Sequence, residues 1–210
     1  ANCDEKDAKK GHLAMEIGQG LHVDAHRKGY TSLSIVGNTL VSMYGKCNAL
    51  VEAEYAFDRL CNRTLVSWNA MSSTYVECGH GKRALQFLKK MQEDGIIPDA
   101  VTFLICFRAC KALLEEEPLI KKQAIIVIGQ ALHKDASRMG YLTNVFVANA
   151  LLVFYSKCGE IVEAETIFHS LAWHSNIVSW VAMISIYVEQ GAGEKALQLY
   201  KKMEHQSLDL

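Results

Sequence analysis

The sequence predicts an all-α solenoid built from repeated pairs of helices, and this prediction rests on three observations. Two stretches, Gly37–Glu54 and Ala148–Glu165, are nearly identical and lie 111 residues apart. Apolar residues follow the i, i+3, i+4, i+7 spacing of helices. A shorter period of 31 or 32 residues, typical of stacked helical repeats, separates the members of a Tyr/Ala pattern within each half: Tyr44/Ala53 and Tyr75/Ala84, then Tyr155/Ala164 and Tyr187/Ala196.

Each repeated unit is predicted to contain a first helix, a short turn and a second helix. Gly79, Gly159 and Gly191 stand at the turns, where a positive φ suits glycine. A lone pair of helices cannot cover its own apolar face, so neighbouring pairs are expected to stack and bury it. In the first complete pair the residues expected in this core are Leu40, Met43 and Tyr44, followed by Ala53, Ala56, Phe57 and Leu60.

The composition excludes several classes of protein. The chain has 210 residues, of which 50% are hydrophobic and only two are proline, which suits long helices. Apolar runs such as Ala124–Ile128 are far shorter than the roughly 18 residues of a membrane span, so no membrane partner is expected. The odd number of cysteines, seven, indicates a reduced protein rather than a disulfide framework. Cys106 and Cys110 have no C-x-x-C or paired histidines to complete a zinc site, so neither a metal nor a cofactor is expected.

The first residues indicate a fragment. The chain begins with Ala1 and shows no charged segment followed by an apolar one, and no Arg-rich targeting segment. Residues 1–3 align with residues 108–110, in the middle of a unit. We therefore expect the sequence to start inside a repeat.

Residues 65–99 resemble a pentatricopeptide repeat, because the segment has the family's 35-residue length and closes on Pro98 and Asp99. The remainder resembles the plant subfamily in which three repeat lengths, called P, L and S, alternate. The resemblance implies one right-handed superhelical solenoid over residues 1–210. The repeats would be a partial L repeat at 1–33, an S repeat at 34–64, a P repeat at 65–99, an L repeat with an insertion at 100–144, an S repeat at 145–176 and a truncated P repeat at 177–210.

Two segments are longer than the family pattern requires. The surplus of the L repeat falls around Glu115–Ala124, where Pro118 interrupts the helical pattern. The N-terminal unit is lengthened around Asp4–Gly11. Both segments are expected to form surface loops that leave the stacking of helices unchanged.

The resemblance implies that the chain binds single-stranded RNA at about one base per repeat. In the family, the fifth and last residues of a repeat contact the base edge. An Asn amide suits this role because it offers both a donor and an acceptor. The base-reading pairs are then Asn69 with Asp99, which in the family prefers U, Asn149 with Asn176, which prefers C, and Asn38 with Thr64, a weak pyrimidine pair.

The second residue of each repeat is implied to wedge between bases, and a lysine near the end of the first helix is implied to contact phosphate. Stacking on an aromatic ring contributes roughly 1–3 kcal/mol per base, so Phe146 should contribute most among the wedges. The phosphate candidates are Lys46 and Lys157. The base-wedging residues are Ile35, Val66, Val101, Phe146 and Val178.

Some observations weaken the RNA hypothesis. Leu104 and Val181 occupy base-reading positions but cannot hydrogen-bond a base, and an Asn early in a helix can instead cap the helix or bond a neighbouring one. A net charge of −1 and a pI near 6.8 are unusual for a nucleic-acid binder, so binding is expected to be modest and salt-sensitive. The competing hypothesis is a protein-interaction scaffold whose concave face binds peptide.

No enzymatic activity is expected from this chain. Some family members carry a deaminase-like domain, but the sequence has neither H-x-E nor C-x-x-C. His22 and His133 are repeat-equivalent and are expected to pack or lie on the surface. The predicted function is an RNA-binding adaptor for editing, modification or processing of transcripts, with an editing or processing enzyme as a further partner. Family habit places it in a mitochondrion or chloroplast.

Overall fold

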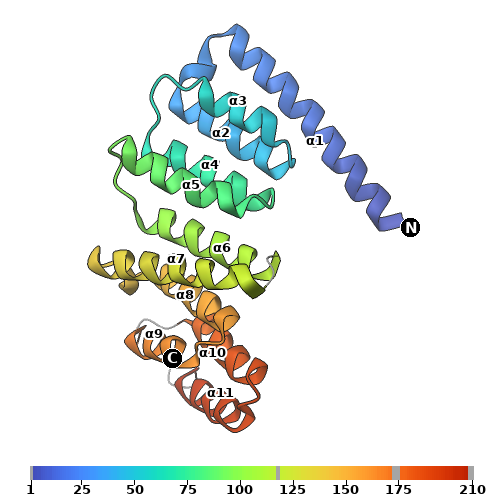
Figure 1. Ribbon diagram of the computed structural model, residues 1–210. Helices are drawn as coiled ribbons and strands as arrows, with labels where there is room; N and C mark the ends of the chain where they lie inside the picture. Colours follow the sequence, from blue (N-terminus) through green and yellow to red (C-terminus); the bar gives the residue numbers. More distant parts are fainter. Residues whose placement is uncertain (1, 117–118, 172–175, 208–210) are drawn as a thin grey trace. The chain divides into compact units, whose positions relative to one another are not determined.

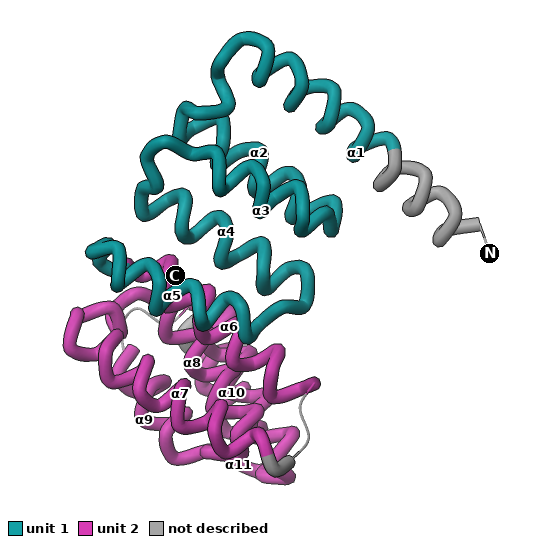
Figure 2. The backbone as a smooth tube through the Cα atoms, turned by 45° about the horizontal axis from the view of Figure 1, so that its top comes forward, with its two compact units in different colours: residues 1–98 teal, residues 99–210 magenta. Residues whose placement is uncertain are grey.

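A computed structural model describes residues 2–116, 119–171 and 176–207, and every regular element in these residues is helical (Figure 1). The chain divides into two compact units, Ala1–Pro98 and Asp99–Leu210 (Figure 2). The first unit contains α1 (Asn2–Arg27), the 3-10 helix η1 (Tyr30–Ser32), α2 (Ser34–Lys46), α3 (Leu50–Asp58), α4 (Leu65–Glu77) and α5 (Gly81–Glu93). The second contains α6 (Ala100–Glu116), α7 (Leu119–Arg138), η2 (Tyr141–Thr143), α8 (Val145–Cys158), α9 (Ile161–Leu171), α10 (Ile177–Glu189) and α11 (Gly193–Ser207).

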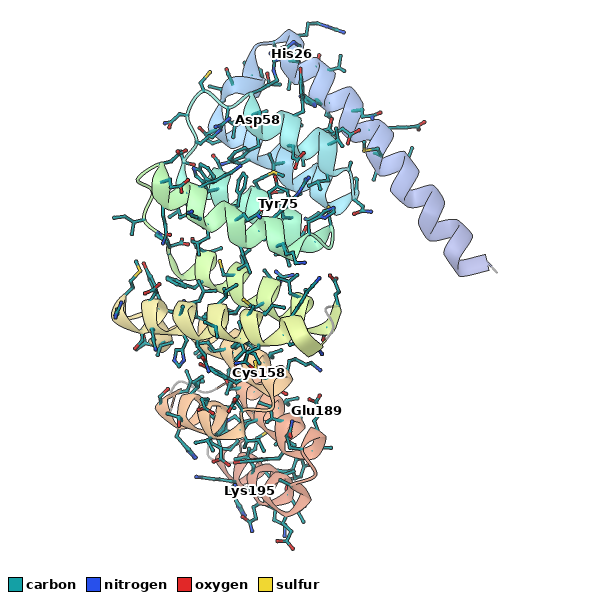
Figure 3. The ribbon with its side chains drawn as sticks, in the orientation of Figure 1. His26, Asp58, Tyr75, Cys158, Glu189 and Lys195 are labelled. Atoms are coloured by element: carbon teal, nitrogen blue, oxygen red, sulfur yellow. The ribbon has the colours of Figure 1, made fainter. Side chains whose placement is uncertain are left out.

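The first unit is a stack of helical pairs. Helix α2 packs against α3 and α4, α4 packs against α5, and α1 contacts α2 and η1. The core between α3, α4 and α5 is aromatic: the ring centroid of Phe87 lies 4.8 Å from Trp68, 5.2 Å from Phe57 and 5.1 Å from Tyr75. Tyr75, labelled in Figure 3, donates its hydroxyl to Glu54 at 2.9 Å. Arg83 pairs with the same carboxylate at 2.8 Å.

The second unit repeats this plan. Helix α6 packs against α7 and α8, α8 against α9 and α10, and α10 against α11. Phe107, Phe154 and Met183 are fully buried in its core. The carboxylate of Glu165 accepts from the Tyr187 hydroxyl and from Lys195, each at 2.8 Å, in the same arrangement as in the first unit.

Glycine turns join the helices of several pairs, as the sequence predicts. Gly79, Gly159 and Gly191 have φ of 77°, 78° and 72°, a left-handed conformation that side chains with a Cβ rarely adopt. In the pair α2–α3 the corresponding turn uses Asn48, with φ of 55°. Asparagine tolerates this conformation better than most residues, so the turn is kept without glycine.

Helix pairs approach closely where a glycine of one helix faces a large side chain of the next. A Cβ added to Gly18 of α1 would lie 2.5 Å from the sulfur of Met43. A Cβ added to Gly129 of α7 would lie 2.1 Å from the ring of Phe154. The two glycines are 111 residues apart, so both units use the same contact between a second helix and the next first helix.

The prediction of two surface loops is wrong for the described residues. Residues 4–11 lie within α1, and residues 115–116 and 119–124 lie within α6 and α7. Pro118 lies outside the described residues. Both segments are rich in Lys, Glu and Ala, which have high helix propensity, so the additional length extends helices instead of forming loops. Among the described residues, no helix combines the length and apolar character that a bilayer span requires.

Candidate functional site

Five first helices, α2, α4, α6, α8 and α10, place an apolar residue on the surface at their second position. These side chains lie in the first turn of each helix and are from 49% to 83% exposed. Within each unit, exposed aliphatic and aromatic groups thus recur at equivalent points of successive pairs, a pattern typical of a binding surface. The five residues are the predicted wedges Ile35, Val66, Val101, Phe146 and Val178.

A hydrogen-bond network in the second unit joins the predicted pair Asn149 and Asn176. The Oδ1 atom of Asn176 accepts from the backbone N–H of Ser179 at 3.1 Å, which caps the N-terminus of α10. The same Oδ1 accepts from Nδ2 of Asn149 at 3.4 Å, and the Ser179 hydroxyl donates to Oδ1 of Asn149 at 2.7 Å. The orientation of the Asn149 amide is thereby fixed from α10.

This network leaves mainly donors available. In the described part of the chain, both N–H groups of the Asn176 amide lack a partner, as does the second N–H of Asn149. The Oδ1 atom of Asn149 keeps one lone pair beside its bond to Ser179. The site therefore suits a partner that presents hydrogen-bond acceptors.

An apolar groove of about 320 Å³ runs beside Asn149. Phe146 and Val178, the wedge residues of α8 and α10, both line it, together with Leu104 and Phe107 of α6. A planar ring could thus contact Phe146 and Val178 while its polar edge meets the Asn149 amide. The rest of the lining comes from Ala150 and Val153 and from two cations of α6, Arg108 and Lys111.

The equivalent site in the first unit is arranged differently. Thr64 forms a capping box with Ser67: its hydroxyl accepts from the Ser67 N–H at 3.4 Å, and its own N–H donates to the Ser67 hydroxyl at 3.1 Å. Neither residue reaches Asn38, whose Oδ1 is buried and has no hydrogen-bond partner among the described residues. The Asn38 amide is therefore not held from α4.

The third predicted pair is divided between the two units. Asn69 is buried on α4 in the first unit. Asp99 belongs to the second unit, where its carboxylate accepts from the N–H and the hydroxyl of Thr102, each at 2.9 Å, at the start of α6. Of the two residues that cannot bond a base, Leu104 lines the groove and Val181 is exposed.

The residue that caps a helix is the last residue of a predicted pair, not the Asn early in the helix that the sequence suggested. Thr64 and Asn176, the last residues of their predicted repeats, cap α4 and α10. Neither Asn38 nor Asn149 caps its own helix, because α2 and α8 begin after Leu33 and Asn144. The other alternative, a bond to a neighbouring helix, is what Asn149 makes.

The two lysines predicted to contact phosphate differ in their surroundings. Lys157 Nζ lies 3.9 Å from carboxylate oxygens of both Glu115 and Glu189, and Figure 3 shows Glu189 at the end of α10. Lys46 is exposed, and no carboxylate pairs with it in the described residues. Lys46 is thus free to meet an anion, whereas Lys157 is partly neutralised.

The histidines behave as packing residues with a specific partner. His22 Nδ1 lies 2.7 Å from the Tyr44 hydroxyl, and His133 Nδ1 lies 2.8 Å from the Tyr155 hydroxyl. Burial lowers the pKa of His133 and raises the pKa of Tyr155 to about 12. The described residues contain no cluster of three or more His, Cys, Asp or Glu that could hold a metal ion.

Sequence reasoning missed Ser179, Arg108 and Lys111. Ser179 has no role among the residues predicted from the sequence, although its hydroxyl donates to the Asn149 amide. Arg108 and Lys111 lie three residues apart on α6, and helical spacing places them on one face with Leu104. The spacing of four and seven residues from Leu104 is the sequence signal that could have identified Arg108 and Lys111 as site residues.

Comparison with known proteins agrees with the repeat pattern. A PPR repeat family model matches residues 63–112, and a PPR repeat model matches residues 146–173 and 178–208, together about half of the chain. The pentatricopeptide repeat-containing protein At4g18520, chloroplastic, of Arabidopsis thaliana is 34% identical over 197 residues, which are 94% of this chain and 30% of that protein. At1g11290, chloroplastic, of the same organism is 32% identical over 92% of this chain and 23% of its own length.

The fold is also similar to a solved structure. A crystal structure of the pentatricopeptide repeat protein PPR10 in complex with an 18-nt psaJ RNA element superposes with a TM-score of 0.73, at 17% identity. The match covers 90% of this chain and 27% of that one. The predicted all-α solenoid fold is confirmed. The chain spans less than a third of the length of these proteins.

Proposed function

Because this chain belongs to the pentatricopeptide repeat family, we propose that it is a sequence-selective adaptor that binds single-stranded RNA. The observation that supports this most directly is the groove beside Asn149. It combines two apolar side chains from successive first helices, Phe146 and Val178, with an amide whose orientation is fixed. An unpaired base has both features that the groove complements, a flat apolar face and a polar edge.

The hydrogen-bond network supports a preference for cytosine at this groove. Cytosine presents two adjacent acceptors, O2 and N3, whereas uracil presents an N–H at position 3. Asn176 and Asn149 offer the amide N–H donors that are not used in the bond between them. A donor facing the N3–H of uracil would leave both groups unpaired, which costs about 1–3 kcal/mol when the groups are buried.

The other two pairs are proposed on weaker grounds. Asn69 with Asp99 would prefer uracil, because a carboxylate accepts the N3–H that cytosine lacks. Asn38 with Thr64 would show a weak pyrimidine preference, since Thr64 is occupied by its capping box. Leu104 and Val181 would read no base.

Several finer features of the function are part of the proposal. The repeat boundaries at residues 34, 65, 100, 145 and 177, and the alternation of P, L and S lengths, are supported by the helices that begin at these residues. An organellar location is supported by relatives that are named chloroplastic. A role in RNA editing, modification or processing, with a separate enzyme as partner, follows the resemblance alone.

Phosphate contacts are proposed for Lys46 and Lys157. The net charge of −1 means that only local positive charge can attract RNA. Binding should therefore be modest and should weaken steeply as salt increases.

A binding assay with short single-stranded RNAs tests the proposal. The 210-residue chain, Asn149→Ala and the exposed control Gln198→Ala on α11 would be titrated with oligonucleotides that differ by C or U at one position. The unaltered chain and the control should prefer the C-containing RNA by about fivefold, corresponding to one net hydrogen bond of about 1 kcal/mol, and Asn149→Ala should lose this preference.

The outcomes separate the two hypotheses. Equal affinity for all sequences in all three proteins would overturn base selection. An absence of RNA binding even at low salt would support the protein-interaction scaffold instead.

A further inference from the structure

Arg108 lies at the groove that also contains Asn149 and Phe146. We propose that Arg108, on α6, is the principal phosphate contact of the second unit, an inference that rests on the proposed RNA-binding function. Arg108 is exposed and lines the same groove as Phe146 and Asn149. It follows Leu104 by four residues, so the two side chains share one face of α6.

The guanidinium of Arg108 is not engaged elsewhere. Among the residues that the structure describes, no carboxylate or carbonyl pairs with it. The other cation that lines the groove, Lys111, lies 3.9 Å from Glu115. Lys157, the phosphate candidate on α8, lies 3.9 Å from both Glu115 and Glu189. A phosphate would have to compete with carboxylates for either lysine, but not for Arg108.

The shape of the groove directs a phosphate toward this side chain. A base that contacts Phe146 and Val178 with its faces and Asn149 with its edge must leave its sugar and phosphates outside the apolar lining. An exposed guanidinium at the rim can then donate two parallel hydrogen bonds to the phosphate oxygens. Fixing the backbone at this point would also set the register of the base in the groove.

A cation stands at the ninth position on only one of the five first helices. The ninth residue of α2, α4, α6, α8 and α10 is Ser42, Ser73, Arg108, Val153 and Ser185, respectively. Helix α6 is also the one whose fifth residue, Leu104, cannot bond a base. This helix therefore lacks a base-reading residue and supplies a cation in its place.

The test is the salt dependence of RNA binding by Arg108→Gln, Arg108→Lys and Lys157→Gln. For single strands the slope of log affinity against log salt changes by about 0.7 for each phosphate neutralised. Arg108→Gln should reduce the slope by about this amount and weaken binding at low salt about three- to fivefold, equally for C- and U-containing RNA. Arg108→Lys should restore most of the slope, and Lys157→Gln should change it by less than half as much.

Arg138→Gln is the matched control, because it removes the same charge from α7 at a residue that pairs only with Asp135, at 3.6 Å, in the described chain. Its slope should equal that of the unaltered protein. An unchanged slope in Arg108→Gln, a loss confined to one base, or an equal change in Arg138→Gln would overturn the assignment while RNA binding itself persists. Failure of the unaltered chain to bind RNA would instead overturn the proposed function, and this inference with it.

Discussion

Asn38 on α2 and Asn149 on α8 occupy equivalent points of two nearly identical segments, yet their amides are in different states. Asn149 exchanges hydrogen bonds with Asn176 and Ser179, which fix its orientation. The buried Oδ1 of Asn38 has no partner among the described residues. The repeated segments themselves do not explain the difference, because each has an Asn at this point and a Ser at the third position of the next first helix.

The difference arises one residue before that next helix. Thr64 has a short hydroxyl side chain, which hydrogen-bonds Ser67 and does not reach Asn38. Asn176 has a longer amide, whose Oδ1 caps α10 and still reaches Asn149. With Asn at the cap, the hydroxyl of Ser179 lies 3.2 Å from Asn176 Oδ1 and also donates to Asn149 at 2.7 Å, whereas that of Ser67 bonds only Thr64 among the described residues. A single cap residue thus decides whether the base-reading amide on the preceding helix is held.

The largest expected effect concerns the glycines that support the two sites. Gly129→Ala should lower the free energy of unfolding by about 1–3 kcal/mol, because the added methyl overlaps the fully buried ring of Phe154. Gly18→Ala should range from neutral to about 1 kcal/mol stabilising, since the half-buried Met43 side chain can move and Ala favours a helix. Denaturant unfolding followed by circular dichroism measures both. Equal losses in the two variants would show that the contacts are equally rigid.

The next effect concerns the wedges. Phe146→Ala should weaken RNA binding about tenfold, because an aromatic stacking contact contributes roughly 1–3 kcal/mol per base. Ile35→Ala, at the equivalent point of α2, removes only aliphatic contact and should weaken binding about threefold on the same scale. Fluorescence anisotropy with a fixed RNA compares them. Both side chains are largely exposed, so neither variant should change the thermal unfolding midpoint by more than a degree or two.

Exchanging the cap residues tests the comparison directly. Asn176→Thr should reduce the preference for C over U about fivefold, equivalent to the loss of one hydrogen bond of about 1 kcal/mol, and Thr64→Asn should create a similar preference at Asn38. Thr and Asn both cap helices, so unfolding should change by no more than about 0.5 kcal/mol. The measurement is the affinity of each variant for RNAs that differ by C or U at one position. If Asn176→Thr keeps its preference, the Asn149–Asn176 bond does not determine base selection.

The smallest effect separates the two histidines. Burial alone lowers the pKa of His133, whereas the pKa of His22 is lowered by burial and then by the charges of His26 and Arg59. Added salt should therefore raise the pKa of His22 and leave that of His133 unchanged, as followed by NMR titration. A similar salt response of both would contradict this assignment of causes.

The same shifts predict the direction of a pH effect on stability. Below about the ordinary histidine value of 6.5, the unfolded chain binds more protons at these positions than the folded chain does. Stability should therefore fall as the pH decreases through 6.5 toward the lowered folded values. His133→Gln should flatten this part of the pH profile.

The sequence by itself determined the repeated helical pairs, their positive-φ glycine turns and their core. These features depend on local spacing and backbone conformation, which a repeated pattern such as Tyr44/Ala53 and Tyr155/Ala164 displays directly. The loops predicted at Asp4–Gly11 and Glu115–Ala124 were wrong, because local helix propensity outweighed the expected repeat length. The roles of the base-reading, wedge and phosphate residues stay predictions.

Only the tertiary structure decided which side chains meet between helices. The bond of Asn149 to Asn176 and Ser179, and the pairing of Lys157 with Glu115 and Glu189, join residues about 30 or more positions apart. Whether a hydrogen bond or an ion pair forms depends on differences of a few tenths of an ångström in distance and on competing partners. The spacing of residues in a sequence specifies neither. For that reason two segments that are nearly the same sequence present two different sites.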